Sequence, residues 1–166
     1  MGIADQVVME YAYGNQFLWR QRYHRYMDNW YQTLGVEVVF ASGGGIYTSA
    51  AEAAAKVGGK LIGVDVDQST ESPTVITSAM KELADAVQWS LAKVYDNTFS
   101  EIGGVATSLG VETDAVGLPT ETWSMTNFTV EQYEALYQQV KDGTLTVDDN
   151  YDNLEQDYSN LTLNII

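Results

Sequence analysis

Short apolar segments alternate along this chain with segments of helical periodicity, and this alternation restricts the possible folds more than any other feature. The candidate strands are residues 6–13, 36–41, 60–65, 74–78, 103–109 and 114–118. The candidate helices are residues 18–34, 48–57, about 79–95 and about 129–141. Such an order predicts an α/β fold, built as a three-layer sandwich around a mainly parallel sheet of about five strands. We expect 36–41 and 60–65 to be neighbours in that sheet, joined by a right-handed crossover.

The first candidate helix carries large apolar side chains at spacings of three and four residues. These side chains are Trp19, Tyr23, Met27, Trp30 and Leu34. A stripe with this spacing packs inward in most helices, so we interpret it as part of the core. The chain has 166 residues, of which 45% are hydrophobic, and this is enough for one cored domain. We therefore expect a single α/β lobe over residues 1–147, followed by an acidic tail over residues 148–166.

Charge and residue usage exclude several classes of partner and chemistry. The 8 Lys and Arg against 23 Asp and Glu give a net charge of −15, which argues against nucleic-acid and anionic-lipid partners. Without cysteine, disulfides, thiolate metal sites and a cysteine nucleophile are excluded. With one histidine and no spaced calcium loop, we predict no metal site and no cofactor.

The start of the sequence bears on localisation. No apolar run approaches the roughly 20 residues that a membrane-spanning helix needs. Residues 1–5 lack the basic start and apolar segment of a signal peptide. The chain is therefore expected to be either cytoplasmic or a piece of a longer, exported parent protein.

A glycine-rich turn between a strand and a helix is the first candidate for ligand contact. Ser42 and Gly43 begin a Ser-Gly-Gly-Gly segment, where the backbone can approach a ligand closely beside the unpaired N–H groups of a helix. Such a site suits hydroxyls, carboxylates or phosphates. An ordinary tight turn between strand and helix remains the alternative interpretation.

Two acidic residues follow at the end of the next strand. Asp65 lies at the carboxyl end of 60–65, where open α/β sheets bind ligands, and its carboxylate can accept two hydroxyl hydrogen bonds from a vicinal diol. It also stands twenty residues after Gly45, the offset at which dinucleotide-binding folds place their ribose acid. Asp67 is either a second ligand contact or a solvated loop residue.

Lys81 is the third candidate, because it conflicts with the local pattern. If Ser78 caps the helix that follows, Lys81 lies in the first turn and opposes the helix dipole by roughly 0.3–1 kcal/mol. A tertiary reason would be a salt bridge to Asp65 and a hydrogen bond to the same ligand hydroxyl. The alternative is a free surface lysine.

Several segments together resemble one known family. The segments VEVVFASGGGIYTSAAEAAAK, KLIGVDVDQS, PTVITSAMKELADAV and DAVGLP occur in the order found in basic-membrane-protein lipoproteins. These substrate-binding proteins are similar to the purine nucleoside receptors of spirochaetes. The resemblance covers roughly residues 7–145 and rests on Gly-Val-Asp-x-Asp-Gln-Ser and Thr-Ser-x-x-Lys, here residues 63–69 and 77–81.

The resemblance implies a fold and a function without catalysis. It implies one lobe, the second, of a type I periplasmic-binding-protein fold that captures nucleosides for an ABC importer. In such proteins Asp65 and Lys81 would hold the ribose hydroxyls, and Ser42 and Gly43 would line the sugar. An aromatic residue after the first strand would stack on the base, with Phe17 as the choice among Tyr13, Phe17 and Trp19.

The resemblance also implies partners. The family's proteins have two lobes, so we expect this chain to lack the first lobe together with its signal sequence and lipidated cysteine. The intact parent would be an extracytoplasmic, membrane-anchored lipoprotein that docks on an ABC permease. A wall without its partner lobe predicts homodimers. The alternative function is a dinucleotide- or nucleotide-sugar-binding domain of an enzyme, although Thr48 stands where that fingerprint has its last glycine.

Overall fold

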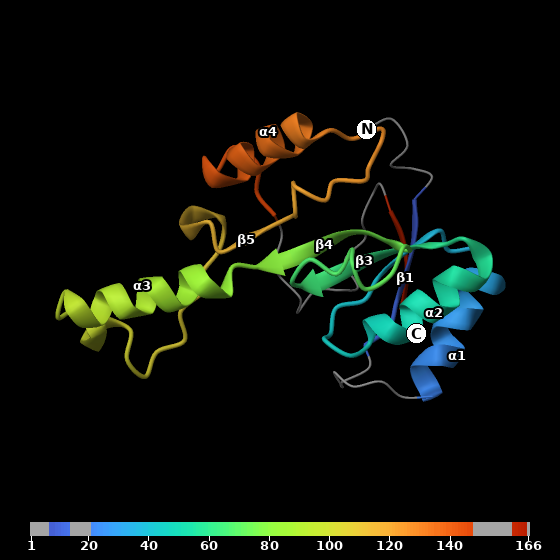
Figure 1. The fold of residues 1–166 in the computed structure, drawn as a ribbon, viewed down its shortest axis with the longest axis horizontal. Coiled ribbons are helices and arrows are strands. Elements are labelled where there is room, and N and C mark those ends of the chain that lie inside the picture. Colours follow the sequence, from blue (N-terminus) through green and yellow to red (C-terminus); the bar gives the residue numbers. More distant parts are fainter. Residues whose placement is uncertain (1–6, 14–20, 148–160, 166) are drawn as a thin grey trace.

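A computed structural model of the chain describes residues 7–13, 21–147 and 161–165. The strands are β1 (Val8–Tyr11), β2 (Val38–Phe40), β3 (Lys60–Asp65), β4 (Val75–Lys81), β5 (Val116–Gly117) and β6 (Thr162–Ile165). The helices are α1 (Gln21–Gln32), α2 (Tyr47–Val57), α3 (Leu83–Tyr95) and α4 (Val130–Lys141). Strands and helices alternate along the chain except at β3 and β4, which follow each other without a helix, and this order confirms the predicted α/β class (Figure 1).

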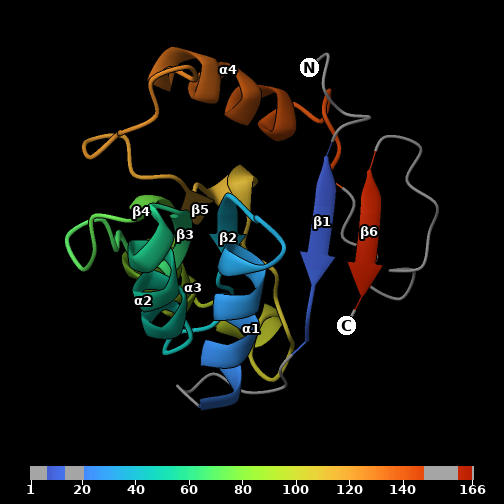
Figure 2. The ribbon, with the colours of Figure 1, turned by 90° about the vertical axis from the view of Figure 1, so that its right-hand side faces the viewer.

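The strands form two sheets in the described part of the chain, rather than the one sheet of about five strands that we expected. The larger sheet has the order β2-β3-β4-β5, in which β2, β3 and β4 are parallel and β5 runs antiparallel to β4. The strands β1 and β6 form a separate parallel pair (Figure 2). The sheet is thus mainly parallel, as predicted, and its β2 and β3 are neighbours, as predicted.

The core lies between the larger sheet and the helices α1 and α2. Its buried side chains come from α1, β2, α2, β3 and β4, and they include Met27, Trp30, Val39, Ala50 and Leu61. Met27 and Trp30 confirm the predicted stripe of α1, but Leu34 is 50% exposed because α1 ends two residues earlier. Trp19 lies outside the described residues.

The close packing of α1 on α2 depends on small residues. Alanines at positions 50, 53 and 54 are completely buried on α2. Gly58 ends α2 in the left-handed conformation, at φ 72°, which costs glycine no strain. At the next position an added Cβ on Gly59 would lie 2.5 Å from the ring of Tyr31, whose hydroxyl donates to the Lys60 carbonyl. Burial of this ring raises the pKa of Tyr31 to about 12.

The remaining helices differ in how they meet the sheet. α4 lies on the opposite side of the larger sheet from α1 and α2, which gives the three predicted layers (Figures 1 and 2). α3 extends away from the sheet, in line with β4, and none of its residues is buried (Figure 1). None of the helices in the described ranges is long and apolar enough to cross a membrane.

Two predicted elements were wrong. The expected strand at 103–109 is a series of turns followed by irregular, unpaired chain, because Gly104 adopts a positive φ of 80° after a 3₁₀ turn at Phe99–Glu101. The expected helix at about 79–95 begins only at Leu83. β4 continues through Lys81 instead, because Met80 and Lys81 pair with Gly117 and Val116 of β5.

Candidate functional site

The carboxyl ends of β2, β3 and β4 lie at the same edge of the larger sheet, because the three strands are parallel. Phe40 pairs with Ile62, and Asp65 pairs with Met80. Each strand is followed at this edge by one of the candidate segments: the glycine turn after β2, Asp65 at the end of β3, and Lys81 at the end of β4. This edge is the usual place for ligands in open α/β sheets.

Asp65 and Lys81 form an ion pair across the ends of β3 and β4. The Nζ of Lys81 lies 2.9 Å from Oδ1 of Asp65, and the side chains are 65% and 42% exposed. Both groups therefore remain accessible to a ligand. A carboxylate accepts hydrogen bonds and an ammonium donates them, so the pair can engage both hydroxyls of a vicinal diol.

The structure confirms the predicted salt bridge but corrects its local reason. Lys81 is the last residue of β4, not a residue in the first turn of a helix, so it does not oppose a helix dipole. Ser78 is not a helix cap. It is fully buried in β4, where its Oγ accepts a hydrogen bond from the backbone N–H of Gln68.

The glycine turn leads directly into α2. Ser42 is exposed and Gly43 is buried, and the N–H of Ile46 donates to the Gly43 carbonyl at 3.1 Å. An added Cβ at Gly44 would meet nothing within 4 Å, so one side of the turn is open space. The N-cap of α2, Ile46, offers no side-chain cap. The N–H of Ser49 donates to the Ile46 carbonyl at 3.1 Å, which leaves the N–H groups of Tyr47 and Thr48 for water or a ligand.

Asp67 binds within the protein through both of its carboxylate oxygens. Oδ1 accepts from the N–H of Ser69 at 3.0 Å, and Oδ2 accepts from the hydroxyl of Thr122 at 2.7 Å. Burial acts to raise the pKa of Asp67, but these hydrogen bonds outweigh it and hold the pKa below its ordinary value. Asp67 therefore links the loop after β3 to the segment after β5 rather than standing free in solvent.

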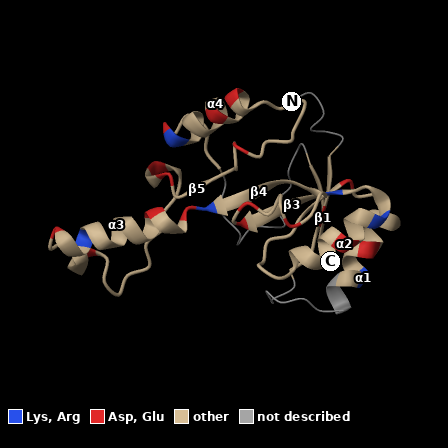
Figure 3. Ribbon diagram, in the orientation of Figure 1, with Lys and Arg blue, Asp and Glu red and all other residues tan. Residues whose placement is uncertain are grey.

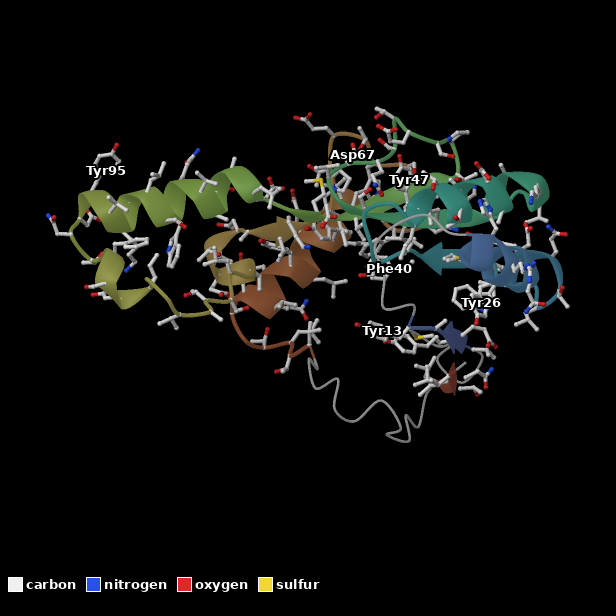
Figure 4. All side chains as sticks on the ribbon, turned by 90° about the horizontal axis from the view of Figure 1, so that it is seen from below. Tyr13, Tyr26, Phe40, Tyr47, Asp67 and Tyr95 are labelled. Carbon is white, nitrogen blue, oxygen red and sulfur yellow. The ribbon has the colours of Figure 1, made fainter. Side chains whose placement is uncertain are left out.

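The predicted base-stacking residue, Phe17, lies outside the described residues, and so does Trp19. Of the three aromatic candidates, Tyr13 is described, and it is 74% exposed just after β1. In the view of Figure 4, Tyr13 lies below Phe40, whose side chain is itself 54% exposed. Base contact by any of these aromatic residues remains a prediction.

Two residues with clear roles at this edge were not recognised in the sequence. Gln68 is buried and accepts a hydrogen bond from the Val64 N–H through Oε1, and Thr122 anchors Asp67. A glutamine between two acidic and two hydroxyl residues looks like ordinary loop sequence, and only its burial reveals it. In the described part of the chain, no three His, Cys, Asp or Glu side chains are grouped so that they could hold a metal ion.

Comparisons with known proteins agree on one family. The family model of PnrA-like ABC transporter substrate-binding proteins (Bmp) matches residues 6–160. Basic membrane protein D of Borreliella burgdorferi (strain JD1) is 40% identical over 87 residues, which are 51% of this chain and 25% of that protein.

Solved structures with little sequence identity share the fold. A transcriptional activator of the comK gene from Bacillus halodurans has a TM-score of 0.67 at 16% identity, over 82% of this chain and 47% of that one. A solute-binding protein of an ABC transporter system from Aeropyrum pernix K1 has a TM-score of 0.54 at 23% identity, over 80% of this chain and 47% of that one. The chain thus spans about half of each solved relative and a quarter of the curated one.

Proposed function

This chain belongs to the family of PnrA-like ABC transporter substrate-binding proteins, and we propose that it is a lobe that binds nucleosides through their ribose hydroxyls. The observation that carries the proposal is the accessible ion pair of Asp65 and Lys81 at the carboxyl edge of the sheet. A ribose presents two adjacent hydroxyls, and each can both donate and accept. Asp65 accepts from them and Lys81 donates to them, so the pair matches a diol better than a single charged ligand group.

The glycine turn completes the sugar side of the proposed site. Ser42 supplies an exposed hydroxyl, and the open side of Gly44 lets a ligand approach the backbone. The uncapped start of α2 adds N–H donors that favour oxygen atoms. None of these groups is a nucleophile next to a general base, so the proposed activity is binding without chemistry.

We also propose the setting in which this lobe works. The chain spans 47% of the solved solute-binding protein, so a second lobe of similar size would close the site from the opposite side. The intact parent would be an extracytoplasmic lipoprotein that delivers its ligand to an ABC permease. Without the second lobe, the chain has one wall of the site, and we expect weak binding and a tendency to form homodimers.

Titration calorimetry with purine nucleosides tests the proposed function. Asp65→Ala and Lys81→Ala should each weaken binding by about 1.5–3 kcal/mol, the usual scale for hydrogen bonds to charged groups. Asp96→Ala is a matched control, because this exposed aspartate follows α3, far from the carboxyl edge. Unchanged affinity in both site variants would show that the ion pair does not hold the ligand.

A further inference from the structure

Asp65 has an unusual backbone conformation at the proposed site. Its φ is 69°, in the left-handed region that few non-glycine residues occupy. The N–H of Val66 donates to the carbonyl of Val64 at 2.8 Å, which closes a three-residue γ-turn around Asp65. A γ-turn with a positive central φ is rare and strained, so the surrounding structure must hold it in place.

Gln68 stabilises this turn from inside the loop. Its Oε1 accepts from the N–H of Val64 at 3.0 Å, so Gln68 holds the N–H of Val64 while the turn holds its carbonyl. The backbone N–H of Gln68 in turn donates to Oγ of Ser78 at 3.0 Å. Gln68 is 7% exposed and Ser78 is fully buried, so water cannot easily replace either bond.

Gly63 leaves the space that this arrangement needs. A Cβ at Gly63 would lie 2.5 Å from Oε1 of Gln68 and 2.6 Å from Oγ of Ser78. Any larger residue at this position would push the glutamine carbonyl away from the Val64 N–H. Gly63, Gln68 and Ser78 thus form a buried network that reaches the turn around Asp65 through the N–H of Val64.

We propose that Gln68 is a positioning residue, which holds the Asp65 turn so that the carboxylate is directed toward Lys81 before a ligand arrives. The proposal rests on the proposed function for the role of Asp65. Asp65 is the last residue of β3, where it pairs with Met80, and the turn sets the direction of its side chain. Holding the turn in advance removes an ordering cost from ligand binding.

Gln68→Met and Gln68→Glu separate this role from simple loop stability. Methionine has a similar length without the oxygen acceptor, whereas glutamate keeps an oxygen at the same place. We expect Gln68→Met to weaken ribonucleoside binding by on the order of tenfold and to abolish the preference over the 2′-deoxynucleoside. Gln68→Glu should retain that preference. Gly63→Ala, which displaces the glutamine carbonyl, should behave like Gln68→Met and serves if the methionine variant does not fold.

Thr74→Val controls for lost stability. Thr74 is equally buried, at 7% exposure, and it bonds to Ser72 at the opposite end of β4. This variant should lower the melting temperature without changing the preference for the ribonucleoside. Gln68→Met with a wild-type preference for the ribonucleoside would overturn the proposal.

A spectroscopic measurement decides the question without any ligand. The one-bond Hα–Cα coupling of Asp65, measured by NMR, reports whether φ is positive. We expect a positive φ in the wild-type chain and in Gln68→Glu, and its loss in Gln68→Met. A positive φ that persists in Gln68→Met would refute the positioning role, whereas a chain that binds no nucleoside but loses the positive φ in Gln68→Met would refute only the proposed function.

Discussion

At the scale of single residues, Asp67 makes stability depend on pH in a predictable direction. Its folded pKa is depressed below the unfolded value of about 3.9, so its contribution is present above that pH and is lost as the pH falls through the folded pKa. We expect Asp67→Asn to shrink the difference in the free energy of unfolding between pH 7 and pH 3. Thr122→Val should act in the same direction, since it removes the strongest bond to this carboxylate.

Urea unfolding at several pH values measures this effect. Asp96→Asn is the control, because this exposed residue has no such bonds to a loop across the sheet edge. An undiminished pH dependence in Asp67→Asn would mean that the bond to Thr122 does not form in solution.

Asp65 and Lys81 show what the sequence could predict about single residues and what it could not. Their pairing was predicted because a lysine in the first turn of the expected helix needed a tertiary reason, and Asp65 at the end of the preceding strand offered one. The position of Lys81 on a strand could not be predicted, because pairing with β5, more than thirty residues later, extends β4 through it. The support from Gln68 was missed for the same reason, since Ser78 and Val64 meet it only after the loop has folded back.

At the scale of elements, the packing of α1 against the turn after α2 depends on a missing side chain. Gly59→Ala would place a Cβ 2.5 Å from the Tyr31 ring, and this ring is held by its bond to the Lys60 carbonyl. We expect a loss of about 1–3 kcal/mol in the free energy of unfolding, the usual cost of overpacking. Gly44→Ala, where the added Cβ meets nothing, should cost much less. Equal melting temperatures for the two variants would contradict the packing.

α4 begins with a capping box at Thr129, the residue at which the sequence placed the start of this helix. The Thr129 side chain accepts from the N–H of Gln132, and the Gln132 side chain accepts from the N–H of Thr129. Local signals of this kind were sufficient for the ends of α2, β3 and α4. They failed at 103–109, where an apolar alternation without a neighbouring strand to pair with does not make a strand.

At the scale of the whole molecule, α3 is a helix that the rest of the described chain leaves largely uncovered. Leu83, Val87, Leu91 and Val94 form a stripe along it, and each is 49–59% exposed. On the other side of α3, Lys93 bonds to Glu101 and lies 5.8 Å above the ring of Trp89. Acidic residues are spread over many of the described elements (Figure 3), whereas the stripe presents only aliphatic side chains. Such a surface favours a partner.

We expect this stripe to contribute to self-association of the chain. Its spacing is nearly symmetric about its centre, so an antiparallel second copy would place Leu83 against Val94. Leu91→Glu should reduce association in light scattering while changing the free energy of unfolding by less than about 0.5 kcal/mol, as for most exposed positions. Val105→Glu, at a residue that is 64% exposed outside α3, is the control. A chain that stays monomeric at every concentration would show that a second copy is not what covers α3.

Recognition of a ribose by the Asp65–Lys81 pair is the central claim, and the most direct measurement compares three ligands by titration calorimetry. Inosine, 2′-deoxyinosine and 3′-deoxyinosine share a base and differ only in the hydroxyls that the pair would engage. We predict that inosine binds more tightly than either deoxynucleoside, by about 1.5–3 kcal/mol per missing hydroxyl, and that Asp65→Ala brings all three to a similar affinity. Equal affinities of the three ligands for the wild-type chain would contradict recognition through the ribose.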